Sequence, residues 1–293
     1  GKAADVLRSK GIDASTIHSL IYEPVDDGPR TRSSVPTFIR KSAINAKGII
    51  VDEASMVGRS IYNDLISFEL PIIFVGDHGQ LEPVGEGLSL MINPDYRLET
   101  VHRNAGDIAI FAHHLRSGLS AETFEATEKV KIVSKNKSND DDLLSADQII
   151  CAKNNTRVGI NRYIRRLKGE EGNRPVVGDR VISLKNSKEY GLFNGTQAIV
   201  RSVSARRMTV MLPNRTHVSL KFNEDTFNQE KPHLDAGVHP FDFAYAITCH
   251  KAQGSEWGTV LVLEEVCELW DHKRWAYTAA SRAKDKLIWV TPN

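Results

Sequence analysis

The sequence predicts an α/β protein with parallel sheets and a small antiparallel barrel inserted in its second half. Residues 48–53 (GIIVDE) and 72–77 (IIFVGD) are short apolar runs that end in a carboxylate. They do not alternate with polar residues, which indicates strands buried on both faces of a parallel sheet. Residues 179–239 alternate in short segments separated by turn residues, which is typical of a small barrel.

The remaining elements follow in order along the chain. Residues 105–116 (AGDIAIFAHHLR) carry apolar positions at helical spacing and stop before Gly118. A polar, acidic stretch at 134–142 (SKNKSNDDD) predicts a linker between two domains, which we place at 119–145. A strand over 148–152 and a basic amphipathic helix over 154–168 then begin the second domain.

The prediction of an inserted barrel is based on several short alternating strands and two turn pairs, Asn194-Gly195 and Pro213-Asn214. Its expected strands cover residues 180–184, 197–200, 208–211 and 217–220. Runs typical of buried strands return at residues 245–248, 259–263 and 287–290. The sequence therefore predicts that the second domain consists of residues 146–178 and 240–293, interrupted by the barrel.

Composition sets broad bounds on function. The chain has 293 residues, 41% of them hydrophobic and 26% charged, which is ordinary globular composition for about two domains. Its 38 basic and 37 acidic side chains give a net charge of +1, so any basic surface must be local. The three cysteines form no C-x-x-C pair, and no apolar run approaches a membrane span. We expect buried thiols and a cytoplasmic location.

The two acidic strand ends carry the expected chemistry. Asp52 and Glu53 form a Walker B arrangement, in which one carboxylate holds Mg²⁺ and the next polarises the attacking water. Gln80 lies in the loop after the second strand, within residues 76–84 (GDHGQLEPV). Its amide can donate and accept hydrogen bonds, and so can hold a water or a phosphate oxygen. Taken alone, each feature is equally compatible with a solvated turn.

Six segments in order resemble the motifs of the superfamily 1B helicases, the RecD-like and Dda-like 5′-to-3′ DNA motors. The segments are GKAA with TIHSL (1–4 and 16–20, motif Ia), VDEASM (51–56, II), GDHGQLEPV (76–84, III), ETVHR (99–103, IV), AITCHKAQGSE (246–256, V) and YTAASRA (277–283, VI). The resemblance implies two RecA-like domains, residues 1–118 and the second domain above, with an SH3-like insertion at 179–239. It also places a duplex-splitting hairpin at 24–42.

The resemblance further implies roles for individual residues, with ATP and Mg²⁺ bound in a cleft shared by the two RecA-like domains. Asp52 would hold Mg²⁺, Glu53 would be the catalytic base and Gln80 the γ-phosphate sensor, and Arg103 and Arg282 would be arginine fingers. Gln253, Gly254 and Glu256 would line the nucleotide, and Lys2, His18, Thr248 and His250 would contact DNA phosphates. Single-stranded DNA and its junctions with duplex would be the partners.

Three further expectations concern surfaces. The basic face of the helix at 157–166 is expected to be a solvated domain surface rather than a DNA track. Phe193, Asn194 and Gly195 are candidates to face the DNA strand, although an Asn-Gly pair is equally explained as a solvated hairpin tip. Phe193 and Trp257 are candidates for base stacking.

The sequence departs from the family in one respect, because it contains no G-x-x-x-x-G-K-[ST] loop to cradle phosphates. The chain starts at Gly1-Lys2 without Met, and we expect it to be part of a longer polypeptide whose first strand and phosphate loop lie upstream. As given, the chain is expected to hydrolyse ATP negligibly.

Three alternatives stay open from the sequence. The chain is also compatible with a non-catalytic nucleic-acid-binding module that has lost its nucleotide site. It is equally compatible with the motor part of a larger nuclease or relaxase assembly. RNA is a possible substrate as well, because phosphate contacts do not distinguish the two sugars.

Overall fold

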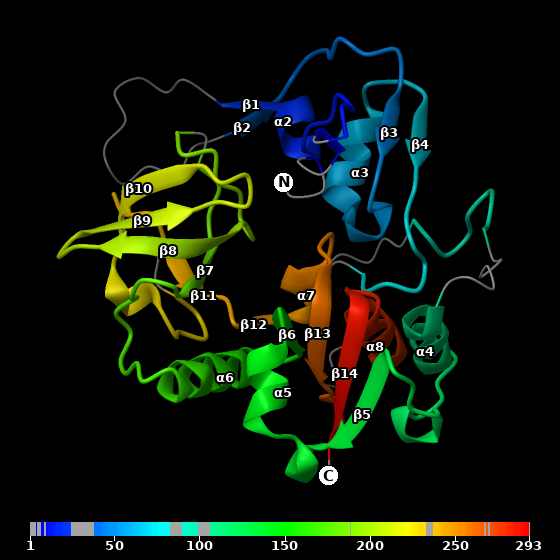
Figure 1. The fold of residues 1–293 in the computed structure, drawn as a ribbon. Coiled ribbons are helices and arrows are strands. Elements are labelled where there is room, and N and C mark those ends of the chain that lie inside the picture. Colours follow the sequence, from blue (N-terminus) through cyan, green and yellow to red (C-terminus); the bar gives the residue numbers. More distant parts are fainter. Residues whose placement is uncertain are drawn as a thin grey trace. The chain divides into compact units, whose positions relative to one another are not determined.

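The computed structural model describes residues 4, 7–8, 10–24, 38–82, 90–98, 106–187, 189–232, 237–266, 268 and 270–292 (Figure 1). The chain divides into two compact units, Gly1–Val101 and His102–Asn293. Each unit is described by itself. Most of the expected hairpin at 24–42 lies outside the described residues, but its two ends form β1 (Tyr22–Pro24) and β2 (Phe38–Arg40), which pair antiparallel.

The first unit is built on a parallel pair of strands, β3 (Ile49–Val51) and β4 (Ile72–Phe74). The parallel pairing confirms the sequence prediction. The helices α2 (Ile17–Ile21) and α3 (Arg59–Ile66) pack against it, and Ile21, Val51 and Leu65 belong to one buried cluster. The cluster also holds Ile49, Ala54, Val57 and Met91.

The expectation that these strands are buried on both faces was wrong for the described residues. Ile50 is 72% exposed and Ile73 is 60% exposed, and the two are register partners. Successive strand residues point to opposite faces, so Ile49 and Val51 pack in the α2–α3 cluster while Ile50 points away from it. An apolar run without alternation does not reveal how many layers cover it.

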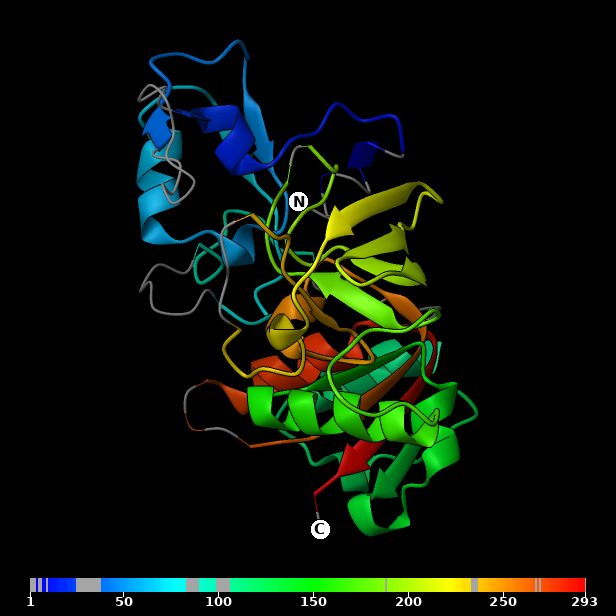
Figure 2. The ribbon, with the colours of Figure 1, turned by 90° about the vertical axis from the view of Figure 1, so that its left-hand side faces the viewer.

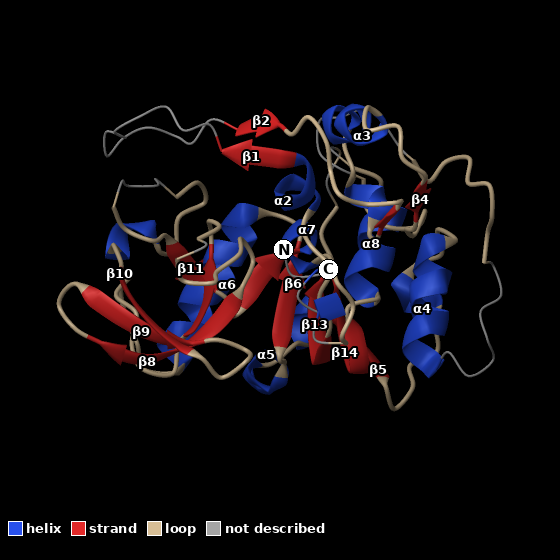
Figure 3. Cartoon of the chain, turned by 90° about the horizontal axis from the view of Figure 1, so that it is seen from above, coloured by secondary structure: helices blue, strands red, loops and turns tan. Residues whose placement is uncertain are grey.

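The second unit contains a five-stranded parallel sheet in the order β12-β6-β13-β14-β5. The strands are β5 (Val130–Ser134), β6 (Gln148–Cys151), β12 (Ala246–Thr248), β13 (Trp257–Leu263) and β14 (Ala283–Thr291). Helix α6 (Asn154–Leu167) covers one face, and α4 (Gly106–Arg116) and α8 (His272–Ala280) cover the other (Figures 2 and 3). A parallel sheet with helices on both faces agrees with the predicted RecA-like fold.

The predicted linker at 119–145 was wrong. Its residues form β5 and α5 (Asp140–Ser145), and β5 pairs with β14 along its whole length. Helix α4, expected in the first domain, packs on α8 and β14 of the second unit. The polar run 134–142 misled the prediction because a solvated helix start, capped by Asn139 on the Asp142 amide at 2.9 Å, has the same composition as a linker.

The predicted insertion is present as a five-stranded antiparallel sheet in the order β10-β9-β8-β7-β11. Its strands are β7 (Arg180–Ser183), β8 (Gln197–Val203), β9 (Arg207–Met211), β10 (His217–Lys221) and β11 (Phe241–Phe243). The sheet extends beyond the expected end at 239, because β11 pairs with β7. Its SH3-like character stays a prediction.

The described cysteines and helices agree with the composition. Cys151 and Cys249 are free and buried, as expected, and Cys267 lies outside the described residues. Burial raises the pKa of the Cys249 thiol to about 12. Among the residues that the structure describes, no helix has both the length and the apolar character needed to cross a membrane.

Candidate functional site

Asp52 and Glu53 form a turn directly after β3. The Asp52 side chain is exposed, and its Oδ1 accepts the backbone amide of Glu53 at 2.9 Å. Glu53 adopts the left-handed conformation, with φ of 53° and ψ of 41°, and begins a short 3₁₀ turn over Ala54–Met56. Non-glycine residues rarely take this conformation, and such strain gathers at functional turns. The chain bends here so that two carboxylates leave the strand end in succession.

The loop after β4 is locked to this turn. The amide of Val75 donates to the carbonyl of Val51 at 2.8 Å, and the amide of Ala54 donates back to the carbonyl of Val75 at 2.9 Å. A Cβ at Gly76 would lie 3.0 Å from the amide nitrogen of Ser55 and 3.1 Å from that of Ala54. Only glycine permits this approach. The structure therefore brings the Asp52-Glu53 turn and the Gln80 loop to one edge of the sheet.

Gln80 is buried and has an unused acceptor. Its backbone amide donates to the Asp77 carbonyl at 3.1 Å, and the Asp77 carboxylate accepts the Gly79 amide at 2.8 Å. The side-chain Oε1 of Gln80 and the hydroxyl of Ser55 are buried without a hydrogen-bond partner among the described residues. An unpaired buried polar group costs about 1–3 kcal/mol. Such groups fit a site completed by a ligand or water.

The acidic turn also fits a magnesium ion that is bound with a nucleotide. No group of three or more His, Cys, Asp or Glu side chains that could hold a metal exists within the described ranges. Mg²⁺ commonly uses one or two carboxylates together with waters and substrate phosphates. Asp52, exposed at the strand end, satisfies that requirement without a dedicated protein cage.

Motif V of the second unit leaves the parallel sheet at Thr248. This residue caps the four-residue helix α7 (Cys249–Ala252) without a side-chain capping bond. His250 packs edge-on against Trp270 with ring centroids 5.7 Å apart, and burial lowers the pKa of its imidazole. The helix ends at Ala252, Gln253 is its C-cap residue, and Gly254 has a φ of +68° that favours glycine.

Arg282 of motif VI lies against motif V. Only 6% of Arg282 is exposed, and its guanidinium donates to the carbonyls of Thr278 at 3.0 Å and Ser255 at 3.4 Å. The Trp257 amide donates to the Arg282 carbonyl at 3.0 Å. Glu256, expected beside the nucleotide, is exposed and pairs with Lys284 at 3.0 Å. The structure thus joins motifs V and VI, which are separated by about twenty residues of sequence.

The remaining predicted site residues are less closely grouped. His18 is exposed on α2 and its ring lies 5.5 Å from that of Tyr22. Lys2 and Arg103 lie outside the described residues. Phe193 and Trp257 are half-buried, and Asn194 is exposed.

The prediction that the basic face of α6 is a solvated surface was wrong for two arginines. Arg157 is 7% exposed and pairs with Asp242 of β11, and Arg165 is 1% exposed and pairs with Asp179 at 3.3 Å. The Arg165 guanidinium also lies 4.2 Å from the ring centre of Phe243. The eight-residue spacing of these arginines places them on one helix face, but sequence alone gave no partner for them.

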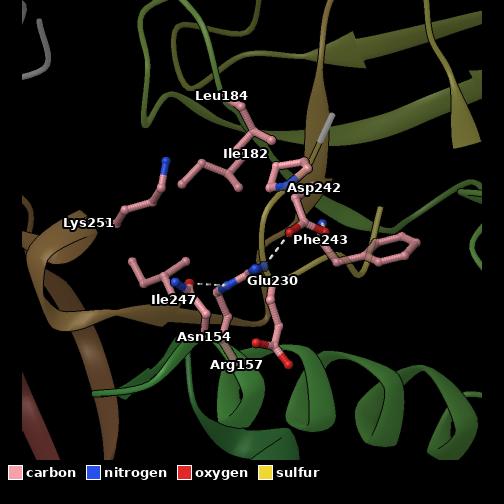
Figure 4. A pocket seen from close by; sticks show the side chains of 10 residues that line it. Asn154, Arg157, Ile182, Leu184, Glu230, Asp242, Phe243, Ile247 and Lys251 are labelled. Atoms are coloured by element: carbon pink, nitrogen blue, oxygen red, sulfur yellow. Dashed lines mark hydrogen bonds and ion pairs between the residues drawn. The ribbon is translucent and has the colours of Figure 1, made fainter. Parts of the chain in front are cut away.

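A pocket of about 250 Å³ opens beside this ion pair (Figure 4). Arg157, Asp242, Glu230 and Lys251 line it, together with apolar side chains that include Ile182. Two cations face two anions, so the lining has no net charge that would select an anionic ligand. Burial raises the pKa of Asp242, while Arg157 and the amides of Asn228 and Phe243 oppose that rise.

Comparisons with known proteins agree with this arrangement. The AAA domain family model matches residues 1–138, and the UvrD-like helicase C-terminal domain model matches residues 243–290. The ATP-dependent RecD2 DNA helicase of Deinococcus radiodurans is 29% identical over 322 aligned positions that include 98% of this chain. The two family models and this relative support the resemblance to RecD-like superfamily 1B helicases. The resemblance predicted from the sequence motifs is therefore confirmed.

The chain spans about half the length of its curated RecD-like relatives. It covers 41% of the Deinococcus protein. It covers 55% of the RecBCD enzyme subunit RecD of Mycolicibacterium smegmatis, which is 23% identical over 96% of this chain.

Solved Pif1 structures share the fold. Bacteroides Pif1 bound to ssDNA matches 98% of this chain and 84% of its own, with a TM-score of 0.61 and 18% identity. Pif1 helicase from Candida albicans matches 83% of this chain and 72% of its own, with a TM-score of 0.51 and 17% identity. At these identities the likeness concerns the fold alone.

Proposed function

We propose that this chain is the core of an ATP-dependent 5′-to-3′ DNA helicase that moves along single-stranded DNA. The observation that carries the proposal is the locked pair of loops after β3 and β4, which presents Asp52, Glu53 and Gln80 at one sheet edge. The relative that matches 98% of the chain is an ATP-dependent DNA helicase by name, which supports the same assignment.

The residues of the first unit would act on the terminal phosphate. Asp52 would hold Mg²⁺, which supplies charge neutralisation at phosphate oxygens when bound. Glu53 would orient and deprotonate the attacking water. The unpartnered Oε1 of Gln80 would accept a hydrogen bond from that water, and its amide group would donate to a γ-phosphate oxygen.

The residues of motifs V and VI would serve the same nucleotide. Arg282 donates to carbonyls of its own unit, which orients the guanidinium and leaves further N–H donors for a phosphate. Arg282 and Arg103 would stabilise transition-state charge, a role worth about 10³–10⁵ in rate for known arginine fingers. Gln253, Gly254 and Glu256 would line the nucleotide.

Single-stranded DNA and its junctions with duplex are the proposed partners, at a cytoplasmic location. Thr248 and His250, at the carboxyl end of β12, would donate hydrogen bonds to phosphates, and Lys2 and His18 would do so on the first unit. Since burial lowers the pKa of His250, the imidazole would contribute a neutral N–H rather than a charge.

The test of the assignment is single-stranded DNA binding by the 293-residue chain, measured by fluorescence anisotropy over a salt series. We expect binding that weakens steeply with salt, because phosphate contacts release counterions. Thr248→Ala should weaken binding without unfolding the chain, since this side chain makes no capping bond. A chain that binds no single-stranded DNA at low salt would contradict the assignment.

A second function, a non-catalytic single-stranded DNA-binding module, is favoured by one observation. Residues 1–293 contain no G-x-x-x-x-G-K-[ST] loop, so these residues by themselves do not supply the usual anchor for the nucleotide phosphates. Both functions predict DNA binding. They differ in whether a chain supplied with such a loop hydrolyses ATP in response to DNA.

A further inference from the structure

A side-chain hydrogen bond joins motif V to the inserted sheet. The Lys251 Nζ atom on α7 donates to the Asn194 Oδ1 atom at 3.1 Å, across 57 positions of sequence. Figure 4 shows the Lys251 side chain extending from α7 toward the side of the pocket that holds Ile182 and Leu184. Lys251 is half-buried and Asn194 is exposed, so the bond lies at the solvent-facing end of this contact.

The turn that carries Asn194 is itself well fixed to β7. The Gly195 amide donates to the Ser183 carbonyl at 2.8 Å, and the Thr196 amide donates to the Phe193 carbonyl at 3.0 Å. The amide of Asn194 donates to the side chain of Asn186 at 2.8 Å. Gly195 has a φ of +90°, a conformation that favours glycine. Motion of this turn therefore carries the adjoining strand end with it.

The base of the insertion is held in a different way. The Arg157–Asp242 pair is almost fully buried, and Asp242 also accepts the amides of Asn228 and Phe243, each at 2.8 Å. Gln197 of β8 donates to Gln148 of β6 at 2.6 Å. These contacts fix the root of the insertion on the parallel sheet. The Lys251–Asn194 bond differs from these contacts, because one of its partners, Asn194, is exposed and its acceptor is a neutral amide oxygen.

We infer that Lys251 is a positioning residue that holds the Asn194-Gly195 turn beside motif V, so that the turn forms part of the single-stranded DNA path. The inference rests on the proposed function, because it assigns the turn to DNA binding. A positioning role differs from direct binding of a phosphate by Lys251. If Lys251 positions the turn, Asn194 is as necessary for DNA binding as Lys251 is.

A double-mutant cycle in the 293-residue chain tests the inference. Lys251→Met and Asn194→Ala are made singly and together, and affinity for a fluorescein-labelled oligothymidylate is measured by anisotropy at fixed salt. We expect Asn194→Ala to lower affinity about two- to tenfold, which corresponds to the loss of one hydrogen bond. Because this substitution changes no charge, the loss measures the hydrogen bond and not a change in charge. In the Lys251→Met background it should cause no further loss.

Controls separate the bond from charge and from misfolding. Lys221 is an exposed lysine on β10 of the same inserted sheet, and in a Lys221→Met background Asn194→Ala should keep its full effect. Lys251→Arg, which keeps a donor, should restore affinity. Hydrogen exchange of the 186–196 segment should become faster in Lys251→Met and in Asn194→Ala, while both unfold at the wild-type temperature.

The outcomes distinguish a positioning role of Lys251 from direct binding of a phosphate. Equal losses from Asn194→Ala in both lysine backgrounds, or no loss in either, would overturn the positioning role. If Lys251→Met lowers affinity and Asn194→Ala does not, Lys251 binds a phosphate directly. Failure of the wild-type chain to bind the oligonucleotide would instead overturn the proposed function, and the inference with it.

Discussion

Gly76 is the residue at which the loops after β3 and β4 of the first unit meet. A Cβ there would approach the Met91 sulfur to 2.9 Å and two backbone amides to about 3 Å, and backbone cannot move as a side-chain end can. Gly76→Ala should therefore lower the free energy of unfolding by about 1–3 kcal/mol through overpacking. Urea unfolding measures this change.

Gly159 in α6 is the matched control for that substitution. A Cβ there meets nothing within 4 Å, and its φ is not positive. Gly159→Ala should leave stability unchanged or raise it by about 0.4–1 kcal/mol, because alanine restricts the unfolded chain. Equal destabilisation by both substitutions would show that the contact at Gly76 is not responsible.

Two histidines should make the protein sensitive to mild acid. Burial lowers the pKa of His250, and burial together with Lys185 lowers that of His239. Below the unfolded value of about 6.5, the unfolded chain takes up protons that the folded chain resists. The free energy of unfolding should therefore fall as pH decreases from about 7 to 5. A His239→Gln/His250→Gln protein with an unchanged pH dependence would contradict this.

At the scale of elements, α6 joins the two sheets of the second unit through buried arginines. The Arg157 and Asp242 side chains are 8% and 2% exposed. Arg157→Met removes the ion-pair partner of buried Asp242, which should cost about 3–5 kcal/mol. Lys284→Ala breaks a pair whose side chains are 56% and 55% exposed, and should cost at most about 1 kcal/mol. Similar losses for both variants would refute the buried coupling.

Sequence patterns predicted those elements whose signal is local. The apolar runs before Asp52 and Asp77, the amphipathic α6 and the alternating strands of the insertion all form where expected. Strand β5 was missed because its place depends on β14, which lies about 150 positions later. The burial of Arg157 was missed for the same reason, since its partner Asp242 is 85 positions away.

In the candidate site, too, the sequence predicted what depends on local motifs and missed what depends on long-range contacts. The motif strings named Asp52, Gln80 and Arg282, and the structure adds how their loops are held. The hydrogen bond between Lys251 and Asn194 links a motif to a hairpin turn. Neither residue carries a sequence pattern that indicates the other, so only the structure reveals the pair.

At the scale of the whole molecule, the chain combines intact motifs II, III, V and VI with the absence of a phosphate loop from its sequence. Without the loop's amides and lysine, the triphosphate loses its main anchor. The 293-residue chain should therefore hydrolyse ATP negligibly even when saturated with single-stranded DNA. A phosphate-release assay with and without oligonucleotide checks this, and a robust DNA-stimulated rate would contradict it.

The most direct test of the proposed motor function is single-turnover ATP hydrolysis by the chain joined behind a segment that carries G-x-x-x-x-G-K-T. We predict hydrolysis that single-stranded DNA stimulates. Glu53→Gln and Arg282→Ala should each lower the rate by about 10³-fold or more while ATP still binds. An extended protein that binds both ATP and DNA yet hydrolyses nothing, or variants that keep the full rate, would contradict the account.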